Sequence, residues 1–154
     1  GKSRFLDMAR QSGEFFSRKY VGRGAAFFDF DNDGDLDVLV HVVEDAPRLL
    51  RNDGGNRRNW LKVVPVWKDT GMVALGSTVT VKAGGITMLQ PVLGVNGYLT
   101  CSDPRPHFGL GGADRAESVE IVWPDGKKQV LDNVRANQVL TVKQDEGRSE
   151  RQRP

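Results

Sequence analysis

Apolar and polar residues alternate along most of the second half of the chain with a period of two. The alternation is clearest in 78–83 (TVTVKA) and 118–123 (SVEIVW), and it recurs around Leu61 and Leu140. This period indicates strands that turn one face toward a core. A glycine pair and a Pro-Asp-Gly triplet supply turns between the runs. We therefore predict an all-β fold, with six or seven short strands here forming a sandwich or barrel and no helix longer than about three turns.

The first third of the chain has a different pattern. Two β-prone runs, 22–28 (GRGAAFF) and 38–43 (VLVHVV), flank a segment rich in aspartate, asparagine and glycine. A third short run, 48–52, ends in the turn signal DGGN, which is the candidate domain boundary. We predict three parts: a β segment over 1–56 that contains the acidic turn, a β-domain over 57–143, and a charged tail over 144–154 that is disordered or a linker.

Composition narrows the class of protein without naming a function. Apolar residues make up 38% and charged residues 27% of the 154 positions, which permits a buried core. The net charge of +2 does not by itself predict nucleic-acid binding. The single cysteine excludes an internal disulfide, and no apolar run reaches the roughly 20 residues of a membrane helix. No signal peptide is visible, and a start without methionine suggests processing or a fragment of a longer protein.

Residues 29–37 (DFDNDGDLD) carry the strongest chemical signal, and we call them the aspartate loop. Ca²⁺ takes roughly six to eight oxygen ligands and favours carboxylates. Carboxylates at positions one, three, five and nine, a glycine at six and a carbonyl at seven suit such an ion. The predicted ligands are Asp29, Asp31, Asp33, Asp35 through its backbone carbonyl, and Asp37. Five carboxylates repel one another unless a cation neutralises them; the alternative is a solvated acidic turn.

The flanking residues distinguish this loop from an EF-hand. An EF-hand needs glutamate at position twelve, where this chain has Val40, and the flanking runs are typical of strands. The loop resembles that of FG-GAP repeats, the blades of integrin-type β-propellers, whose pattern is D-x-D-x-D-G-x-x-D. The resemblance implies a Ca²⁺ site with the ligands just named. A propeller needs roughly four to eight blades, so this blade would be completed by upstream sequence, by another chain or by packing on the second part.

The second part resembles the ASPIC/UnbV domain of cartilage acidic protein-like proteins. The matching stretches are NWLKV at 59–63, LGSTVTVKAGG at 75–85, GYLTCSDPRPHFGLGG at 97–112, VEIVWPDGKKQVL at 119–131 and NQVLTV at 137–142. They follow the family's order and cover more than half of the chain, and the FG-GAP-like loop lies just upstream, as in that family. The resemblance implies an extracellular, periplasmic or cell-envelope location and no established activity. At Cys101 the family more usually has a polar residue.

The sequence gives little support for catalysis. Cys101 and His107 could form a nucleophile pair, but the rigid turn DPRP separates them and no oxyanion hole is evident. We interpret His107 as a structural residue that bonds a turn, His41 as a core or interface residue, and Cys101 as a small buried residue. No phosphate loop, zinc pattern or serine-nucleophile motif is present.

Two further groups of residues have alternative interpretations. Arg51, Arg57, Arg58 and Lys62 form a loose basic cluster, interpreted as a solvated face, or as a site for an acidic glycan or protein. The tryptophans could form a sugar-binding platform; the alternation favours core packing for Trp123, whereas the polar neighbours of Trp67 favour exposure.

Together these observations predict a non-enzymatic module. We expect a calcium-stabilised structural or adhesion domain that binds another protein subunit or the upstream part of its own polypeptide. A carbohydrate-binding accessory domain is the alternative. Neither a nucleic-acid partner nor a membrane span is expected.

Overall fold

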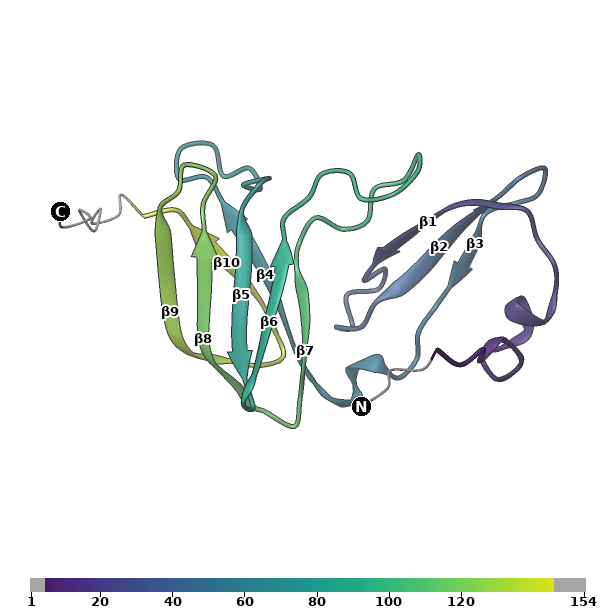
Figure 1. The fold of residues 1–154 in the computed structure, drawn as a ribbon, viewed down its shortest axis with the longest axis horizontal. Helices are drawn as coiled ribbons and strands as arrows, with labels where there is room; N and C mark the ends of the chain where they lie inside the picture. Colours follow the sequence, from purple (N-terminus) through teal and green to yellow (C-terminus); the bar gives the residue numbers. More distant parts are fainter. Residues whose placement is uncertain (1–4, 146–154) are drawn as a thin grey trace.

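The computed structural model describes residues 5–145, which are built mainly from β-strands (Figure 1). The helical segments in this range are short 3₁₀ turns: η1 (Ala9–Gln11), η2 (Glu14–Ser17) and η3 (Gly55–Arg57). The prediction of an all-β chain without a long helix is therefore confirmed. Most of the predicted tail lies outside the described residues; of it, Gln144 is bonded through its backbone amide to the carbonyl of Val66.

Ten strands follow one another along the described chain. They are β1 (Gly22–Phe28), β2 (Asp37–Val42), β3 (Arg48–Leu50), β4 (Asn59–Val66), β5 (Thr78–Ala83), β6 (Ile86–Pro91), β7 (His107–Gly111), β8 (Arg115–Val122), β9 (Lys128–Arg135) and β10 (Gln138–Lys143). They form three sheets with the orders β1-β2-β3, β10-β4-β7 and β6-β5-β8-β9. The pairing of β10 with β4 is parallel, and the other strand pairings are antiparallel.

Strands β4 to β10 form a sandwich of two sheets, which decides between the two predicted architectures. The core cluster takes residues from both sheets, including Leu61 and Phe108 from one and Val81 and Ile121 from the other. These side chains are almost fully excluded from solvent. Their alternation along the strands is the pattern seen in the sequence, because successive residues of a strand point to opposite faces.

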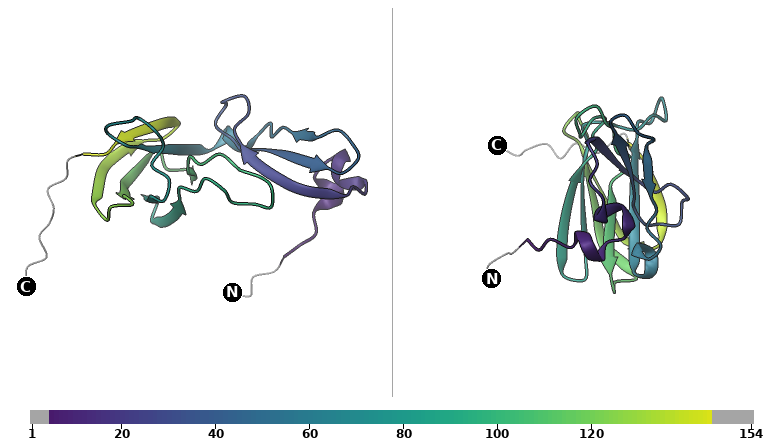
Figure 2. Two further views of the ribbon diagram at one scale, coloured as in Figure 1. Left: turned by 90° about the horizontal axis from the view of Figure 1, so that it is seen from above. Right: turned by 90° about the vertical axis from the view of Figure 1, so that its right-hand side faces the viewer.

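The sheet β1-β2-β3, here called the first sheet, lies beside the sandwich along the long axis of the molecule (Figures 1 and 2). The β6–β7 connection runs along the outer edge of β1. The amide of Asp103 donates to the carbonyl of Phe27 at 2.9 Å, and the amide of Phe27 donates to Ser102 Oγ at 3.0 Å. These bonds cover an edge that would otherwise present unpaired backbone groups.

Candidate metal centre

The aspartate loop connects β1 to β2 and makes its turn with two left-handed residues. Asn32 has φ +59° and Gly34 has φ +98°. A Cβ added at Gly34 would lie 2.1 Å from Cε2 of the Trp60 indole, on β4. Glycine is thus required at position six both for its backbone conformation and for the close approach of the sandwich.

The structure brings three of the five predicted ligands together. One carboxylate oxygen from each of Asp29, Asp31 and Asp37 lies within 4.8 Å of the others. Asp29 and Asp37 are buried, whereas Asp31 is exposed. The group therefore has a protein-facing side and a solvent-facing side, an arrangement that allows an ion to enter. The carboxylates of Asp33 and Asp35 do not belong to this group.

Asp29 uses only one of its two oxygens within the protein. Its Oδ2 accepts hydrogen bonds from Lys62 Nζ at 2.7 Å and from the amide of Gly34 at 3.3 Å. Its Oδ1 has no hydrogen-bond partner in the protein, and water cannot supply one readily because the side chain is only 2% exposed. A buried carboxylate oxygen without a donor is costly, and a bound cation would remove that cost.

Asp37 fixes the exit of the loop. Its two oxygens accept the amide hydrogens of Phe30 and Asn52, each at 2.8 Å. The carboxylate is fully buried, and its position is set from both sides by the backbone. Each oxygen retains a further lone pair that could meet a metal ion.

The side chain of Asp35 has a role that the sequence did not predict, since only its backbone carbonyl was expected to act. Its Oδ2 accepts the amides of Gly55 at 2.9 Å and Asn56 at 3.3 Å, and so ties the loop to the segment before β4. Its Oδ1 is buried without a partner. Burial raises the pKa of this carboxyl above its ordinary value, and the nearby charge of Asp33 raises it further, against the lowering effect of the two amides. The side chain is a structural anchor of the loop.

Asp33 is exposed and organises the turn locally. Its Oδ1 accepts the amide of Asp35 at 3.1 Å, and its carbonyl accepts the side-chain amide of Asn56 at 3.3 Å. Its carboxylate keeps further lone pairs but lies outside the group formed by Asp29, Asp31 and Asp37.

These donors suit a hard cation such as Ca²⁺. The group consists of carboxylates, one of which has an unsatisfied buried oxygen, and no soft sulfur or imidazole ligand belongs to it. Ca²⁺ accepts such oxygens in flexible geometry and completes its shell with carbonyls and water. Asp29, Asp31 and Asp37 would hold the ion directly, and Asp33 and the Asp35 carbonyl lie in the same loop.

The loop is docked on the sandwich by three neighbouring residues, which the sequence did not connect with it. Lys62 reaches Asp29 from β4; His107 Nε2 lies 2.8 Å from the carbonyl oxygen of Gly34; and the Trp60 ring stacks on that of His107 with centroids 5.8 Å apart. We call this set of contacts the junction. The expectation that His107 bonds a turn is confirmed, and the turn is that of the aspartate loop.

Lys62 is not part of a solvated basic face, so that interpretation was wrong for this residue. Its side chain is 1% exposed, whereas Arg51, Arg57 and Arg58 are exposed. Strand β4 is buried on both sides: Leu61 faces the sandwich core, and Lys62 points the opposite way, toward the aspartate loop. A lysine alternating with apolar residues gives no sign of this, because the same pattern describes an exposed face.

The charge of the loop also affects an exposed arginine, Arg51. Arg51 pairs with Asp53 at 2.7 Å, and this hydrogen bond, with smaller contributions from Asp31 and Asp37, raises the pKa of its guanidinium. The loop's negative field therefore extends to the surface.

The prediction that Cys101 is buried was wrong, and so was the core interpretation of His41, whereas an interface role of His41 stays a prediction. Cys101 is an exposed free thiol in the β6–β7 connection, where its neighbour Ser102 takes the inward position by bonding Phe27. His41 is exposed on the central strand β2, where it lines a surface pocket together with Arg23 and Tyr98. Among the described residues no hydrogen bond joins Cys101 to His107, so the structure adds no support for a nucleophile pair.

The tryptophans do not form an exposed platform. Trp123 is 2% exposed, in agreement with the core packing predicted for it, and Trp67 packs partly buried against it with ring centroids 6.1 Å apart. Trp60 is engaged with His107 at the junction. The exposure favoured for Trp67 is therefore wrong.

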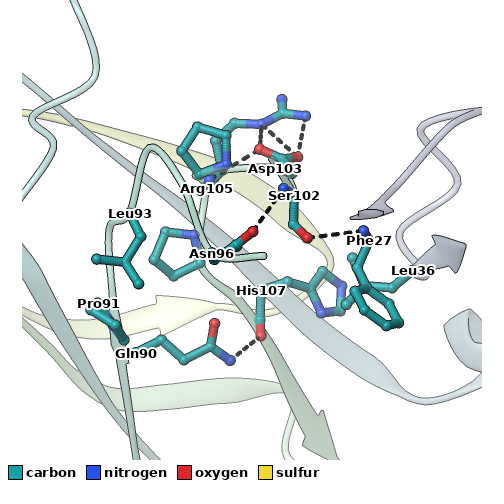
Figure 3. A pocket seen from close by; sticks show the side chains of 12 residues that line it. Phe27, Leu36, Gln90, Pro91, Leu93, Asn96, Ser102, Asp103, Arg105 and His107 are labelled. Atoms are coloured by element: carbon teal, nitrogen blue, oxygen red, sulfur yellow. Dashed lines mark hydrogen bonds and ion pairs between the residues drawn. The ribbon is translucent and has the colours of Figure 1, made fainter. Parts of the chain in front are cut away.

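A cavity of about 270 Å³ opens between the first sheet and the β6–β7 connection (Figure 3). The exposed ring of Phe27 forms one wall, and Asn96 and Gln90 line the opposite side. An ion pair between Asp103 and Arg105, 2.6 Å long, stands at its rim. Although burial raises the pKa of Asp103, the hydrogen bonds and charge of Arg105 bring it below its ordinary value.

Comparison with known proteins places the sandwich in a family. The family model described as ASPIC and UnbV matches residues 69–149, more than half of the chain. The chain therefore belongs to the ASPIC and UnbV family, as the sequence resemblance predicted. The FG-GAP character of the aspartate loop stays a prediction.

Individual relatives extend the similarity upstream of the sandwich. The chain is 40% identical to cartilage acidic protein 1 of Homo sapiens over 127 residues, which is 79% of this chain and 18% of that protein. It is 41% identical to cartilage acidic protein 1 of Xenopus tropicalis and 42% identical to that of Mus musculus, each over 112 residues, 69% of this chain and 17% of the relative. The chain thus spans less than a fifth of the length of these curated relatives.

Proposed function

We propose that the chain is a non-enzymatic, calcium-stabilised module of an extracellular, periplasmic or cell-envelope assembly, and that it binds another protein. The observation that carries the proposal is the unpartnered, buried Oδ1 of Asp29 within the carboxylate group of the aspartate loop. An ion there would stabilise a turn that is itself docked on the family domain. Its role would be structural, since the buried carboxylates of Asp37 and Asp29 already accept bonds from backbone amides and Lys62.

The protein partner would complete the first sheet. This sheet has three strands, and β3 is only three residues long. Leu39 and Leu49 lie opposite each other on β2 and β3 and are about two-fifths exposed, so they form a small apolar pair on one face of the sheet. Further β-structure, from another subunit or from an upstream part of the same polypeptide, would cover these side chains, as in the FG-GAP blade that the loop resembles.

An extracellular location suits both the family resemblance and the proposed ion. Calcium sites of extracellular modules bind with dissociation constants of roughly 0.1 to 1 mM. No helix within residues 5–145 is long and apolar enough to span a membrane.

Thermal melting with and without calcium tests the proposed ion. Chelation should lower the melting temperature, and saturating Ca²⁺ should stabilise the fold by roughly 3 kcal/mol when its free concentration is some hundreds of times the dissociation constant. Mg²⁺ should substitute poorly, because it demands a tight octahedral shell and keeps its waters. An unchanged melting temperature on chelation would exclude the ion.

Substitutions separate ligands from anchors. Asp31→Ala should remove most of the calcium-dependent rise, whereas Asp69→Ala, an exposed aspartate of the sandwich, should leave it intact. Asp35→Ala should lower the melting temperature equally with and without calcium, because its carboxylate bonds Gly55 and Asn56. If Asp35→Ala lost the calcium-dependent rise in melting temperature while Asp31→Ala kept it, the ligands would be assigned wrongly.

A carbohydrate-binding accessory role is the second candidate, favoured by the cavity in Figure 3. An exposed Phe27 ring beside planar polar side chains such as Asn96 can bind the apolar face and the hydroxyl groups of a sugar. A glycan array distinguishes the two candidates. Selective glycan binding that is lost in Phe27→Ala supports the carbohydrate-binding role. Absence of glycan binding, together with capture of a specific protein from the native envelope or matrix, supports the protein-binding module.

A further inference from the structure

The largest fully buried side chain described in this protein is a lysine. Lys62 is 0% exposed and its ammonium group has a carboxylate partner, Asp29, at 2.7 Å. Burying an ammonium group is expensive unless a partner compensates it, so the pair must form whenever the loop and β4 are in contact. The two residues come from different parts of the chain, the aspartate loop and the family domain.

The two carboxylate oxygens of Asp29 have different surroundings. Oδ2 is taken by Lys62 and the Gly34 amide, and Oδ1 is left free inside the carboxylate group. The loop itself does not depend on Lys62 for its shape, because Asp37 and Asp35 are held by backbone amides. Lys62 therefore contributes charge and docking, while the backbone contributes loop conformation.

We propose that Lys62 is a permanent, protein-supplied cation of the aspartate loop, which keeps the loop docked on the sandwich without metal and weakens its affinity for a divalent ion. The effect on affinity rests on the proposed calcium site, and it specifies which residue sets the strength of calcium binding there. The ammonium group neutralises one of the five carboxylates of the loop and repels a second cation that shares Asp29. The metal would then bind as an addition to a preformed junction.

The proposal makes two predictions of opposite sign for Lys62→Met, which removes the charge and retains an unbranched apolar chain. In chelator, the junction should loosen, because a buried carboxylate loses its counter-charge. The amide of Asp103, which bonds the β6–β7 connection to Phe27 on β1, should then exchange with solvent at least about tenfold faster, because β1 enters the loosened loop. Calcium should at the same time bind about tenfold more tightly, because a repelling charge beside the ion is gone.

Isothermal titration calorimetry and amide exchange on the whole chain measure these effects. Lys82→Met, which removes an exposed lysine from β5, is the matched control and should change neither quantity. Calcium binding that is unchanged or weaker in Lys62→Met would overturn the tuning role. Asp103 exchange equal to the wild-type rate in chelator would overturn the docking role.

A third measurement needs no variant and no calcium. In chelator, acetylation of the wild-type chain followed by mass spectrometry should modify Lys82 at least about tenfold faster than Lys62, because only Lys62 is buried in an ion pair. Equal rates would overturn the proposal even if Lys62→Met failed to fold. If the wild type binds no calcium up to about 10 mM, above the range of weak extracellular sites, the proposed function and the tuning role fail, while protection of Lys62 would still establish the docking role.

Discussion

The first sheet and the sandwich are both built from short, mostly antiparallel strands, yet they are held together in different ways. The sandwich encloses a continuous apolar cluster from Leu61 to Val142. Among the described residues before Leu61, Val42 is the one buried apolar side chain. In that region the buried groups are instead Asp29, Asp35 and Asp37, held by amides and by Lys62.

The difference shows that a small sheet can be ordered by polar groups when a larger domain supplies the scaffold. A sheet of three strands can be stable on its own only if one of its faces is apolar and buried, and the first sheet buries the apolar side chain of Val42 alone among its described residues. Buried carboxylates bonded to backbone amides fix one conformation, but each one also requires full compensation of its charge. The first sheet should therefore depend on its docking and on ions, whereas the sandwich should not.

The sharpest test of the apolar side of this comparison is Phe108→Ala. The ring is 1% exposed in the sandwich core, so the truncation should lower the free energy of unfolding by about 4 kcal/mol. Urea denaturation followed by tryptophan fluorescence measures it. Leu89→Ala, at a side chain that is 64% exposed, is the control and should stay within about 0.5 kcal/mol of wild type. Similar losses in both variants would contradict the assignment of the core.

Gly34→Ala tests the docked loop. The alanine would adopt a left-handed conformation and displace the Trp60 indole, so local stability at the junction should fall by about 2 to 3 kcal/mol. Native-state amide exchange should show this loss in β1 and β2 and leave β8 protected. Gly126→Ala, left-handed at φ +83° but with open space around its Cβ, is the control and should cost about 1 kcal/mol. An equal loss in β8 would mean that the two regions open as one unit.

The smallest effect concerns the ion pair at the rim of the cavity. Arg105 brings the pKa of Asp103 below its ordinary value in the folded state, so the pair stabilises the fold above the unfolded pKa of about 3.9. That stability is lost as the pH falls through the lower, folded value. Because Arg105 is one-third exposed, the loss should stay below about 1 kcal/mol.

Melting curves between about pH 6 and pH 3 measure the contribution of the Asp103–Arg105 ion pair to stability. Asp103→Asn should melt slightly lower than wild type at the upper end, and the two curves should converge at the acidic end. Asp69→Asn provides the exposed control. A constant difference across the range would show that the effect of Asp103 does not depend on its charge.

Periodicity predicted most of the sandwich because alternation within a strand is a local property. It missed β7, where Gly109 and Gly111 interrupt the apolar pattern around Phe108 and Leu110. It could not predict the parallel pairing of β10 with β4, since nothing in either strand specifies a partner that is distant in sequence.

The aspartate loop was identified from its spacing, but its surroundings were not. Asp29, Asp31 and Asp37 come together as the spacing suggested. The side-chain role of Asp35 and the burial of Lys62 depend on contacts with residues 20 and 33 positions away in the sequence. Cys101 was misplaced because a tendency toward burial carries little weight in a loop that turns outward.

The parallel pair of β4 and β10 has a mechanical consequence. Residues 59 and 143 lie at opposite ends of this pair, six aligned positions long. Tension applied through the two ends of the domain would act along the strands, and the evenly spaced bonds of a parallel ladder would share the load. Antiparallel neighbours joined by a hairpin would separate one bond at a time under the same tension. A sandwich whose first and last strands pair in parallel would therefore resist tension along the polypeptide. It would transmit that force to the junction before its own strands separate.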